Sequence, residues 1–377
     1  RATPTTTSPT NPGRDHLQEH HLLEHLYNNT QSRQLRSNML MSGTVAETRA
    51  VQRPVGAFSQ RRGWPHPCLA RKKVSTRHSV LAETSPRPGR NSATTNGGRI
   101  TPMRICITGS VATDHLMTFP GKFTDSLLAD QLHTISLSFL VDDLQVRRGG
   151  VAANIAFGLG SLGADPILLA AVGADFADYR SWLDRHGVDT TSVLISEIAH
   201  TARFVCTTDS AHNQIASFYP GAMSEARSIE ISPVAERVGG LDLVLVGPND
   251  PEAMLRHTAE CRERGIPFAA DPSQQLAGMD GPEIRDLIDG AAYLFTNEYE
   301  AALTEQKTGW TAAEVLARVG VRVTTLGKNG AKVETAAVGE VARVGVPAER
   351  GLADPTGVGD AFRAGFLAGL VWDVPLE

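Results

Sequence analysis

The chain has 377 residues, of which 41% are hydrophobic and 20% charged, a composition typical of a globular protein. No apolar run approaches the ~18 residues of a membrane-spanning helix, and the first residues lack the apolar core of a secretory signal. The four cysteines lie far apart and form no CxxC pair, which predicts reduced thiols in a cytoplasmic protein and argues against a zinc ribbon.

Residues 1–102 differ in charge from the rest of the chain. They carry 15 Lys and Arg against 5 acidic residues, whereas the whole chain has a formal net charge of -5. This basic section is rich in Ser, Thr, Pro and Arg and has few periodic apolar residues, so we expect a disordered extension. The acidic remainder argues against nucleic acid as a partner. The alternative, a nucleic-acid-binding basic tail, is disfavoured because the tail has few aromatic side chains for stacking.

The extension also contains 16-HLQEHHLLEH-25, with two HxxEH strings in tandem. On a helix, two histidines four residues apart can bind zinc beside a glutamate base. Without a packed scaffold to supply a third ligand, we interpret the segment as a low-complexity patch. We hypothesise that the native chain begins at Met103.

From Met103 onward, strand-like runs alternate with amphipathic segments, which predicts an α/β fold with a doubly wound, mostly parallel sheet. The expected strands are 104-RICITGS-110, 166-PILLAAVG-173, 242-DLVLVG-247, 266-IPFAAD-271, 292-AYLFT-296 and 321-VRVTTL-326. One helix is expected between Asp250-Pro251, which supply a cap and a first turn, and Gly265, which ends it. Another is expected from Asp175 to His186.

Two segments, about 114–148 and 200–222, interrupt this alternation with short runs rich in Thr, Ser, Phe and Val. We expect them to form β-hairpins and to build a small β-rich lid over a site. The last helix is expected from about Gly359 to Trp372. Because a doubly wound sheet is normally covered on both faces, we expect the domain, 103–377, to be truncated at its C-terminus.

The string 158-GLGSLG-163 matches the GxGxxG pattern of dinucleotide sites. Such a site needs the string between the end of a strand and the start of a helix. Here it follows 151-VAANIAF-157, which already has a helical pattern. The glycines are therefore expected in the last turns of a helix, where close helix packing and a helix stop explain them, and a dinucleotide site is excluded.

The string 354-DPTGVGDAF-362 places glycines and two aspartates before an apolar helix. Amides of Gly357, Val358 and Gly359 can converge at the helix start and bind an anion. Asp360 would then lie in the first turn, where a carboxylate can accept a proton from an attacking hydroxyl while the amides hold a phosphoryl group. The alternative is a capped helix that begins with a glycine turn.

Three other strings favour the chemical interpretation. In 148-RGGVAANIA-156 a tight glycine turn precedes a helix with Asn154 in its first turns, which suits the hydroxyls of a polyol. The string 297-NEYE-300 offers oxygen ligands of the kind that Mg²⁺ uses, usually through water. The strand 321–326 leads into Gly327 and Gly330, a turn able to contact a nucleotide.

Together these strings resemble the two signatures of the ribokinase-like (PfkB-type) kinases, GGxxxN and DxxGxGD. Five further stretches are similar to bacterial, especially actinobacterial, adenosine kinases: 108-TGSVATDHLM-117, 136-SLSFLVDDL-144, 217-SFYPGAMSEAR-227, 270-ADPSQQL-276 and 293-YLFTNEYE-300. The resemblance covers 103–372 nearly continuously. It implies transfer of the γ-phosphate of ATP to the 5′-hydroxyl of adenosine, a step of purine salvage, with Mg²⁺ and, in many members, K⁺.

The resemblance also implies roles for single residues. Asp360 matches the base, and Gly357, Val358 and Gly359 match the anion hole for the γ-phosphoryl group. The residues implied in nucleoside binding are Ser110, Asp114, Ser138, Gly150, Asn154, Phe204, Phe218, Gln274 and Gln275. Those implied in ATP or Mg²⁺ binding are Asn297, Glu300, Thr325, Gly327 and Arg363. The chain departs from the family at Pro355 and Val358, where Thr and Ala are more usual.

Within the nucleoside set, Asp114, Gly150 and Asn154 match groups that hold the ribose hydroxyls, and Phe204 and Phe218 resemble aromatics that enclose adenine. Core packing between lid and sheet is the alternative for both phenylalanines. Two rival functions stay open: a sugar kinase of the same fold acting on ribose or fructose, and a nucleoside-binding regulator without catalysis. Strand-built lids often pair edge to edge, which favours a homodimer.

Overall fold

The computed structural model describes residues 103–127, 134, 136–347 and 356–376, which belong to one compact unit. The disorder expected for residues 1–102 and the start of the 354–362 string lie outside the described residues. Within the described part of the chain, no helix has both the length and the apolar character needed to cross a bilayer.

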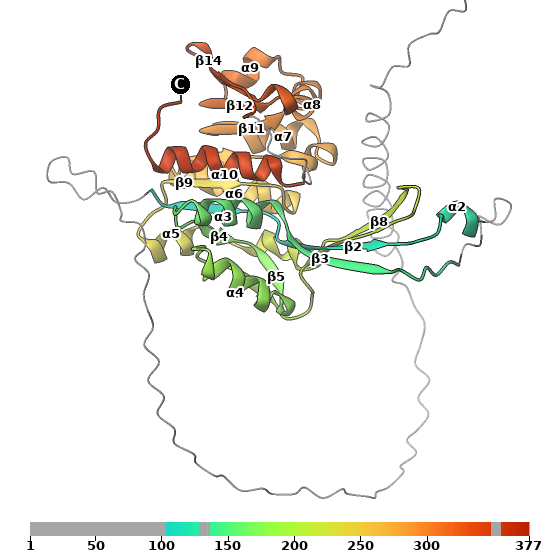
Figure 1. Cartoon of the computed structure of the whole chain (residues 1–377). Helices are drawn as coiled ribbons and strands as arrows, with labels where there is room; N and C mark the ends of the chain where they lie inside the picture. The colour runs from blue at the N-terminus through green and yellow to red at the C-terminus, as the bar shows by residue number, and fades with distance from the viewer. Residues whose placement is uncertain (1–102, 128–133, 135, 348–355, 377) are drawn as a thin grey trace, which may run out of the picture. The chain divides into compact units, whose positions relative to one another are not determined.

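An eight-stranded sheet forms the body of this unit (Figure 1). Its strands, in spatial order, are β14 (Gly339–Val344), β13 (Ala331–Thr335), β12 (Val321–Thr325), β11 (Tyr293–Asn297), β10 (Phe268–Ala270), β9 (Leu243–Val246), β1 (Ile105–Thr108) and β4 (Ile167–Leu169). Every neighbouring pair from β12 to β4 is parallel, and β12, β13 and β14 are joined antiparallel. The predicted doubly wound, mostly parallel sheet is thus confirmed, with an antiparallel edge that was not predicted.

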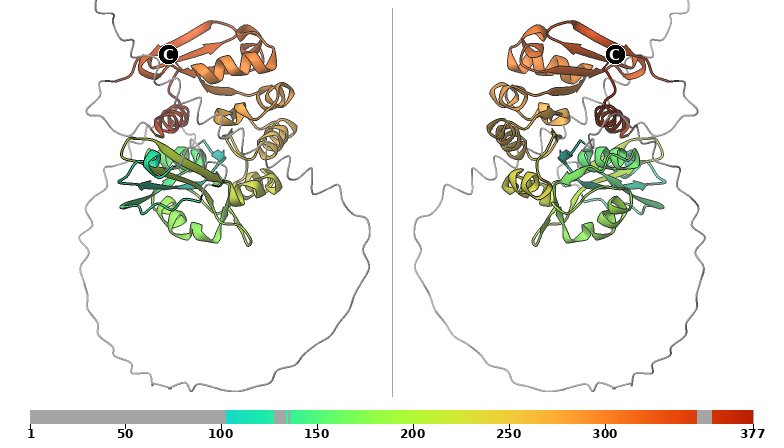
Figure 2. Two further views of the ribbon diagram at one scale, coloured as in Figure 1. Left: turned by 90° about the vertical axis from the view of Figure 1, so that its right-hand side faces the viewer. Right: turned by 90° about the vertical axis from the view of Figure 1, so that its left-hand side faces the viewer.

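Helices cover both faces of this sheet, because successive side chains of its buried strands point to opposite sides. Ile105 and Ile107 of β1 belong to one core, whereas Cys106 between them belongs to the other. The first core is covered by α3 (Val151–Ser161), α4 (Ala177–Arg185) and α10 (Val358–Val371). The second is covered by α5 (Ser232–Val238), α6 (Pro251–Arg264), α7 (Gly281–Ile288), α8 (Glu298–Thr308) and α9 (Ala312–Leu316). Figure 2 shows the two helical layers on either side of the strands.

The ends of α6 follow the predicted signals. The Asp250 carboxylate accepts from the amide of Ala253 at 3.3 Å, and Gly265 ends the helix with φ of 65°. The helix predicted from Asp175 begins instead as a 3₁₀ turn, η2 (Ala174–Phe176), before α4.

A second, four-stranded sheet is built from the two segments expected to form hairpins. Its order is β3 (Asp143–Gly149), β2 (Ala112–Thr118), β7 (Ala202–Thr208) and β8 (Gln214–Tyr219). It extends away from the eight-stranded sheet, with α2 (Phe123–Ser126) at its far end (Figure 1). We refer to these four strands and α2 as the lid sheet.

The apolar run 166–173, predicted as one strand, forms two. Its first half is β4, and its second half is β5 (Ala171–Gly173), which pairs with β6 (Leu194–Ser196) in a separate two-stranded sheet. Both halves are fully buried, so the hydrophobic pattern carries no sign of the change of sheet between them.

Candidate functional site

Most of the predicted residues outside the lid sheet lie at the carboxyl edge of the parallel strands, where ligands of open α/β sheets bind. Four chain segments meet there: the turn after β1, the first turns of α3 and α10, and the start of α8 after β11. The lid sheet leaves the body at the same edge, because β2 follows β1 and β3 leads directly into α3.

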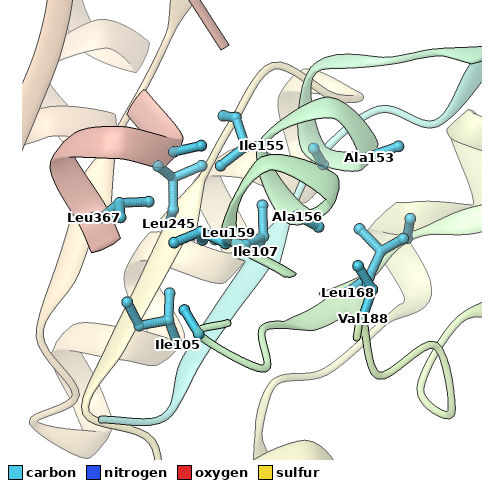
Figure 3. Packing of buried hydrophobic residues seen from close by; sticks show 14 of the residues in the cluster. Ile105, Ile107, Ala153, Ile155, Ala156, Leu159, Leu168, Val188, Leu245 and Leu367 are labelled. Atoms are coloured by element: carbon cyan, nitrogen blue, oxygen red, sulfur yellow. The ribbon is translucent and has the colours of Figure 1, made fainter. Parts of the chain in front are cut away.

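The helices α3 and α10 bring Asn154 and Asp360 together although they are 206 residues apart in the chain. The Asn154 side-chain amide donates to Asp360 Oδ2 at 2.8 Å. The two helices pack closely because Gly158 faces Ala364: a Cβ on the glycine would lie 2.6 Å from the Ala364 Cβ. Figure 3 shows Leu367 of α10 beside the side chains of α3. The GLGSLG string therefore packs in the last turns of α3 and ends beyond it at Gly163, whose φ is 82°, as its position in the sequence indicated.

The carboxyl group of Asp360 is largely enclosed by protein. Burial raises the pKa of this carboxyl above its usual range, the hydrogen bond from Asn154 lowers it, nearby Asp271 raises it and Arg363 lowers it. The net direction is upward. A carboxylate with a raised pKa binds a proton more readily, which improves it as a general base.

The helix α10 begins on Gly357, whose φ of 80° lies in the left-handed region that favours glycine. Helical hydrogen bonding starts where the Ala361 amide donates to the Gly357 carbonyl at 2.9 Å. The amides of Val358, Gly359 and Asp360 therefore have no acceptor within the helix and point out of its start. Such a helix mouth stabilises an anion placed against it.

A buried ion pair lies beneath this turn, and the sequence analysis did not include one of its members, Asp271. The Arg363 guanidinium donates from Nη2 to Asp271 Oδ1 at 2.6 Å, and its Nε lies 2.5 Å from Oδ2. Arg363, predicted to contact phosphate, is thus turned toward Asp271. The available signal was an aspartate placed between the end of a buried strand and a proline.

The residues of the NEYE string cap helix α8. The Asn297 side chain accepts from the Glu300 amide, and Glu300 Oε2 accepts from the Asn297 amide, each at 2.8 Å. Burial raises the pKa of the Glu300 carboxyl, the Asn297 amide lowers it, Asp271 raises it and Arg363 lowers it. The string is therefore a capping box whose carboxylate shares the electrostatic surroundings of Asp360.

The predicted nucleotide contacts lie next to this capping box. Thr325, the last residue of β12, is the register partner of Asn297 on β11. Gly327 follows with φ of 54° in a turn that the Leu326 amide closes by donating to the Gly330 carbonyl at 2.7 Å. The capping box at Asn297 and the turn at Gly327, the two elements predicted to bind ATP, thus lie side by side at the ends of β11 and β12.

At the other side of Asp360 lies the turn that carries Gly150. Its φ is 93°, and a Cβ there would lie 2.6 Å from the Ser110 carbonyl oxygen, so only glycine fits. The Ser110 hydroxyl accepts from the amide of Val151 at 3.1 Å and so fixes the start of α3. The Asp114 carboxylate covers the Gly149 backbone, where a Cβ would lie 2.8 Å from its Oδ2.

The hydroxyl of Tyr179 binds this turn and lies within electrostatic range of Asp360. It donates to the Gly149 carbonyl at 3.0 Å. Burial is the main cause of its raised pKa, Arg148 lowers it, and the carboxylates of Asp114 and Asp360 both raise it further. Asp114, predicted to bind ribose, and Asp360, the predicted base, therefore lie near the same hydroxyl. The sequence analysis did not include Tyr179.

The lid sheet places three predicted residues in one row. Asp114 on β2 is the register partner of Phe204 on β7, which is the partner of Phe218 on β8. Directly paired residues point to the same face of a sheet. Phe218 is 38% exposed and Phe204 partly buried, so neither belongs to a closed core. Ser138 is exposed and lies outside the strands of the lid sheet.

The two glutamines have different surroundings. Gln275 is buried in η4 (Ser273–Ala277), where its side-chain amide donates to the Asn249 carbonyl at 2.5 Å. Gln274 is exposed and its side-chain oxygen accepts from the Ser273 hydroxyl at 2.7 Å. Of the two, Gln274 is the one open to solvent.

Comparisons with known proteins agree with this arrangement. Residues 110–377 match the pfkB family of carbohydrate kinases. A nucleoside kinase of Burkholderia thailandensis, solved with inosine, is 36% identical, with a TM-score of 0.60 over 71% of this chain and 83% of that one. A nucleoside kinase of Methanocaldococcus jannaschii is 28% identical over 61% of this chain and 74% of its own length.

A solved ribokinase of Cryptococcus neoformans, in complex with ADP, shares the fold. Its sequence identity is 20% and its TM-score 0.60, over 73% of this chain and 89% of that chain. At this level of identity the likeness concerns the arrangement of sheets and helices alone.

Proposed function

Because the chain belongs to the pfkB family of carbohydrate kinases, we propose that this ATP-dependent kinase phosphorylates a nucleoside, namely the 5′-hydroxyl of adenosine, giving AMP and ADP. One observation carries the proposal: Asp360 is held by Asn154 at the open start of α10, and both Asp360 and Asp114, the first member of the lid row, are near enough to the Tyr179 hydroxyl to raise its pKa. A base, an anion hole and an aromatic surface are thereby available to one substrate.

In this mechanism Asp360 accepts the proton of the 5′-hydroxyl as that oxygen attacks the γ-phosphorus of ATP in line. The amides of Val358 and Gly359 donate to the transferred phosphoryl oxygens at the helix mouth. Asn154 orients the carboxylate of the base through its 2.8 Å hydrogen bond. The helix and sheet hold these groups in place before the substrate arrives, so little reorganisation is needed during the reaction.

The lid row supports a nucleoside over a free sugar. A carboxylate can accept hydrogen bonds from two vicinal ribose hydroxyls, and Phe204 and Phe218 present aromatic surface beside it. Adenine offers a flat face that stacks on such rings, whereas ribose and fructose have none. A sugar substrate would therefore make no stacking contact with Phe204 and Phe218.

Mg²⁺ fits the chemistry of the residues near Asn297. No cluster of three or more His, Cys, Asp or Glu side chains able to hold a metal ion occurs in the described ranges. This accords with Mg²⁺, which usually binds through water, one or two carboxylates and substrate phosphates. Asp271, Glu300 and Asp360 all raise the pKa of the Arg363 guanidinium, so three carboxyl groups lie near one cation. Glu300 would hold the ion through water, and the ion would neutralise phosphate charge. K⁺ stays a proposal from the family resemblance.

A substrate panel tests the proposal. Release of ADP is measured with adenosine, inosine, cytidine, ribose and fructose as acceptors, and kcat/KM is compared. We expect adenosine to give the highest value, with the sugars lower by at least about 10²-fold because they leave the aromatic row empty. A higher value for another nucleoside would correct the base preference, and a higher value for ribose would favour the sugar kinase. If none of the acceptors gave ADP release, the result would support the regulator.

We also propose that two copies associate through the lid sheet, without nucleic acid as a partner. On the face opposite to Phe218, Leu144, Val146 and Ile215 are 55%, 57% and 50% exposed. Covering these exposed apolar side chains with a second copy of the chain removes them from water and lowers the free energy. Light scattering of the wild type and Val146→Lys tests this, and a monomeric wild type would contradict it.

A further inference from the structure

One buried arginine lies among three carboxylates beneath the first turn of α10. Arg363 is 8% exposed and Asp271 is 0% exposed, and two of the guanidinium nitrogens lie 2.6 Å and 2.5 Å from the Asp271 oxygens. Glu300 and Asp360 are near enough to raise the pKa of the same guanidinium. The arginine therefore joins elements that come from three parts of the chain.

The guanidinium lies directly against the backbone of the helix mouth. A Cβ on Gly359 would lie 2.9 Å from Arg363 Nη1, so the absence of a side chain at Gly359 gives the arginine its place. The ring of Phe295, from β11, lies under the guanidinium carbon at 5.9 Å from the ring centroid. Arg363 is thus confined by the helix turn, an aromatic ring and Asp271.

Asp271 is itself fixed to the sheet. It directly follows β10, and its amide donates to the Val246 carbonyl of the neighbouring strand β9 at 2.9 Å. Its carboxylate is consequently an anchor at the carboxyl edge of two central strands. Apolar packing of α10 on α3 is not directional, whereas a two-nitrogen ion pair in a buried site holds both orientation and distance.

From this geometry we propose that Asp271 is a positioning residue: through Arg363 it fastens the first turn of α10, with its anion-binding amides and Asp360, to the edge of the sheet. The inference rests on the proposed function, since it concerns the groups that perform phosphoryl transfer there. A shift of about 1 Å in such groups can lower the rate by about 10²-fold.

A structural ion pair alone would have a different signature. The charged and titratable groups that face Asp360 are Asp271 after β10, Arg363 on α10 itself and the Tyr179 hydroxyl on α4. Asp271 raises the pKa of the Asp360 carboxyl and Arg363 lowers it. Substitutions of the two partners therefore move the pH dependence of the reaction in opposite directions, which a loss of folding stability does not.

The experiment compares Asp271→Asn, Arg363→Met and the double variant with the full wild-type chain. For Asp271→Asn we expect kcat to fall between about 10- and 100-fold while KM for both substrates changes little. The acidic limb of the kcat/KM profile moves to lower pH in Asp271→Asn and to higher pH in Arg363→Met. The double variant is expected to be no less active than the less active of the two single variants, because both substitutions break the same Asp271–Arg363 ion pair.

The double variant also protects the test against misfolding, because neither Asp271 nor Arg363 is left as a buried charge that has lost its ion-pair partner. Asp289→Asn is the matched control, since it breaks the surface pair between Arg318 and Asp289 (3.3 Å), and should keep wild-type kinetics. A folded Asp271→Asn enzyme with wild-type kcat would overturn the proposal, as would additive losses with an unmoved acidic limb. All variants are measured with whichever acceptor the wild type prefers, so a wrong substrate assignment would not affect the outcome.

Discussion

The carboxyl edge of the eight-stranded sheet and the lid sheet hold the two halves of the candidate site in different ways. Every residue of β9 is buried, whereas every residue of β3 except Gly149 is exposed. The proposed base and anion-binding turn belong to the buried half, and the proposed nucleoside-binding row belongs to the exposed half. Segments with few buried contacts open at lower free energy than a core.

The difference in burial suggests that the rigid edge of the eight-stranded sheet performs the chemical step, whereas the more mobile lid sheet binds the nucleoside. Asp360 is held by a hydrogen bond from α3 and lies over a buried ion pair, while Phe218 projects from an edge strand of the lid sheet. Changes in the buried half should therefore lower kcat, and changes in the lid should mainly raise KM for the nucleoside.

The largest expected effect is that of Asp360→Asn. The amide cannot accept the 5′-hydroxyl proton, so kcat should fall by at least about 10²-fold while nucleoside binding stays largely intact. Calorimetric titration and ADP release measure the two separately. Near-normal turnover would refute the role of Asp360 and remove the basis of the comparison.

Asn154→Leu should have a smaller effect on the same half. It removes the 2.8 Å hydrogen bond to the carboxylate, a charge-assisted contact, so kcat/KM should fall about 10- to 100-fold. That hydrogen bond lowers the pKa of Asp360, so its loss raises the pKa. Because the base acts deprotonated, the acidic limb of the kcat/KM profile should move to higher pH. An unmoved limb would contradict this coupling.

Phe218→Ala tests the lid half. Loss of the ring should raise KM for adenosine about 3- to 10-fold with little change in kcat, since the base and anion hole are untouched. Tyr219→Ala is a matched control, because Tyr219 is similarly exposed at 46% but points to the opposite face of β8. A drop in kcat larger than the rise in KM would break the proposed division.

Lys307→Met tests how strongly the η4 turn, which carries Gln274 and Gln275, depends on its attachment to α8. The Lys307 ammonium on α8 donates to the carbonyls of Leu276, Ala277 and Met279 at 2.6–2.8 Å and holds the η4 turn. Its loss should lower the free energy of unfolding by about 1–3 kcal/mol and raise KM for adenosine only two- to threefold. Denaturant unfolding measures the first effect, with the surface variant Arg264→Met as control.

Local patterns sufficed where one element decides the outcome. Alternation of buried runs with amphipathic segments predicted the parallel sheet, and Asp250, Pro251 and Gly265 predicted both ends of α6. The glycines at Gly357 and Gly359 predicted a helix mouth with free amides, because an N-terminus leaves its first donors unpaired wherever the helix lies. These features depend on neighbours in the chain and are therefore readable from it.

The tertiary structure decided what depends on distant partners. Nothing near Asp271 in the chain indicates that Arg363, 92 residues away, neutralises it, and the continuous apolar run 166–173 conceals a change of sheet. The NEYE string illustrates both levels: its cap is local, but its nearness to Asp271 and Arg363 arises from packing. A charge in a protein interior is tolerable only with a partner, and the choice of partner is made by the fold rather than by sequence spacing.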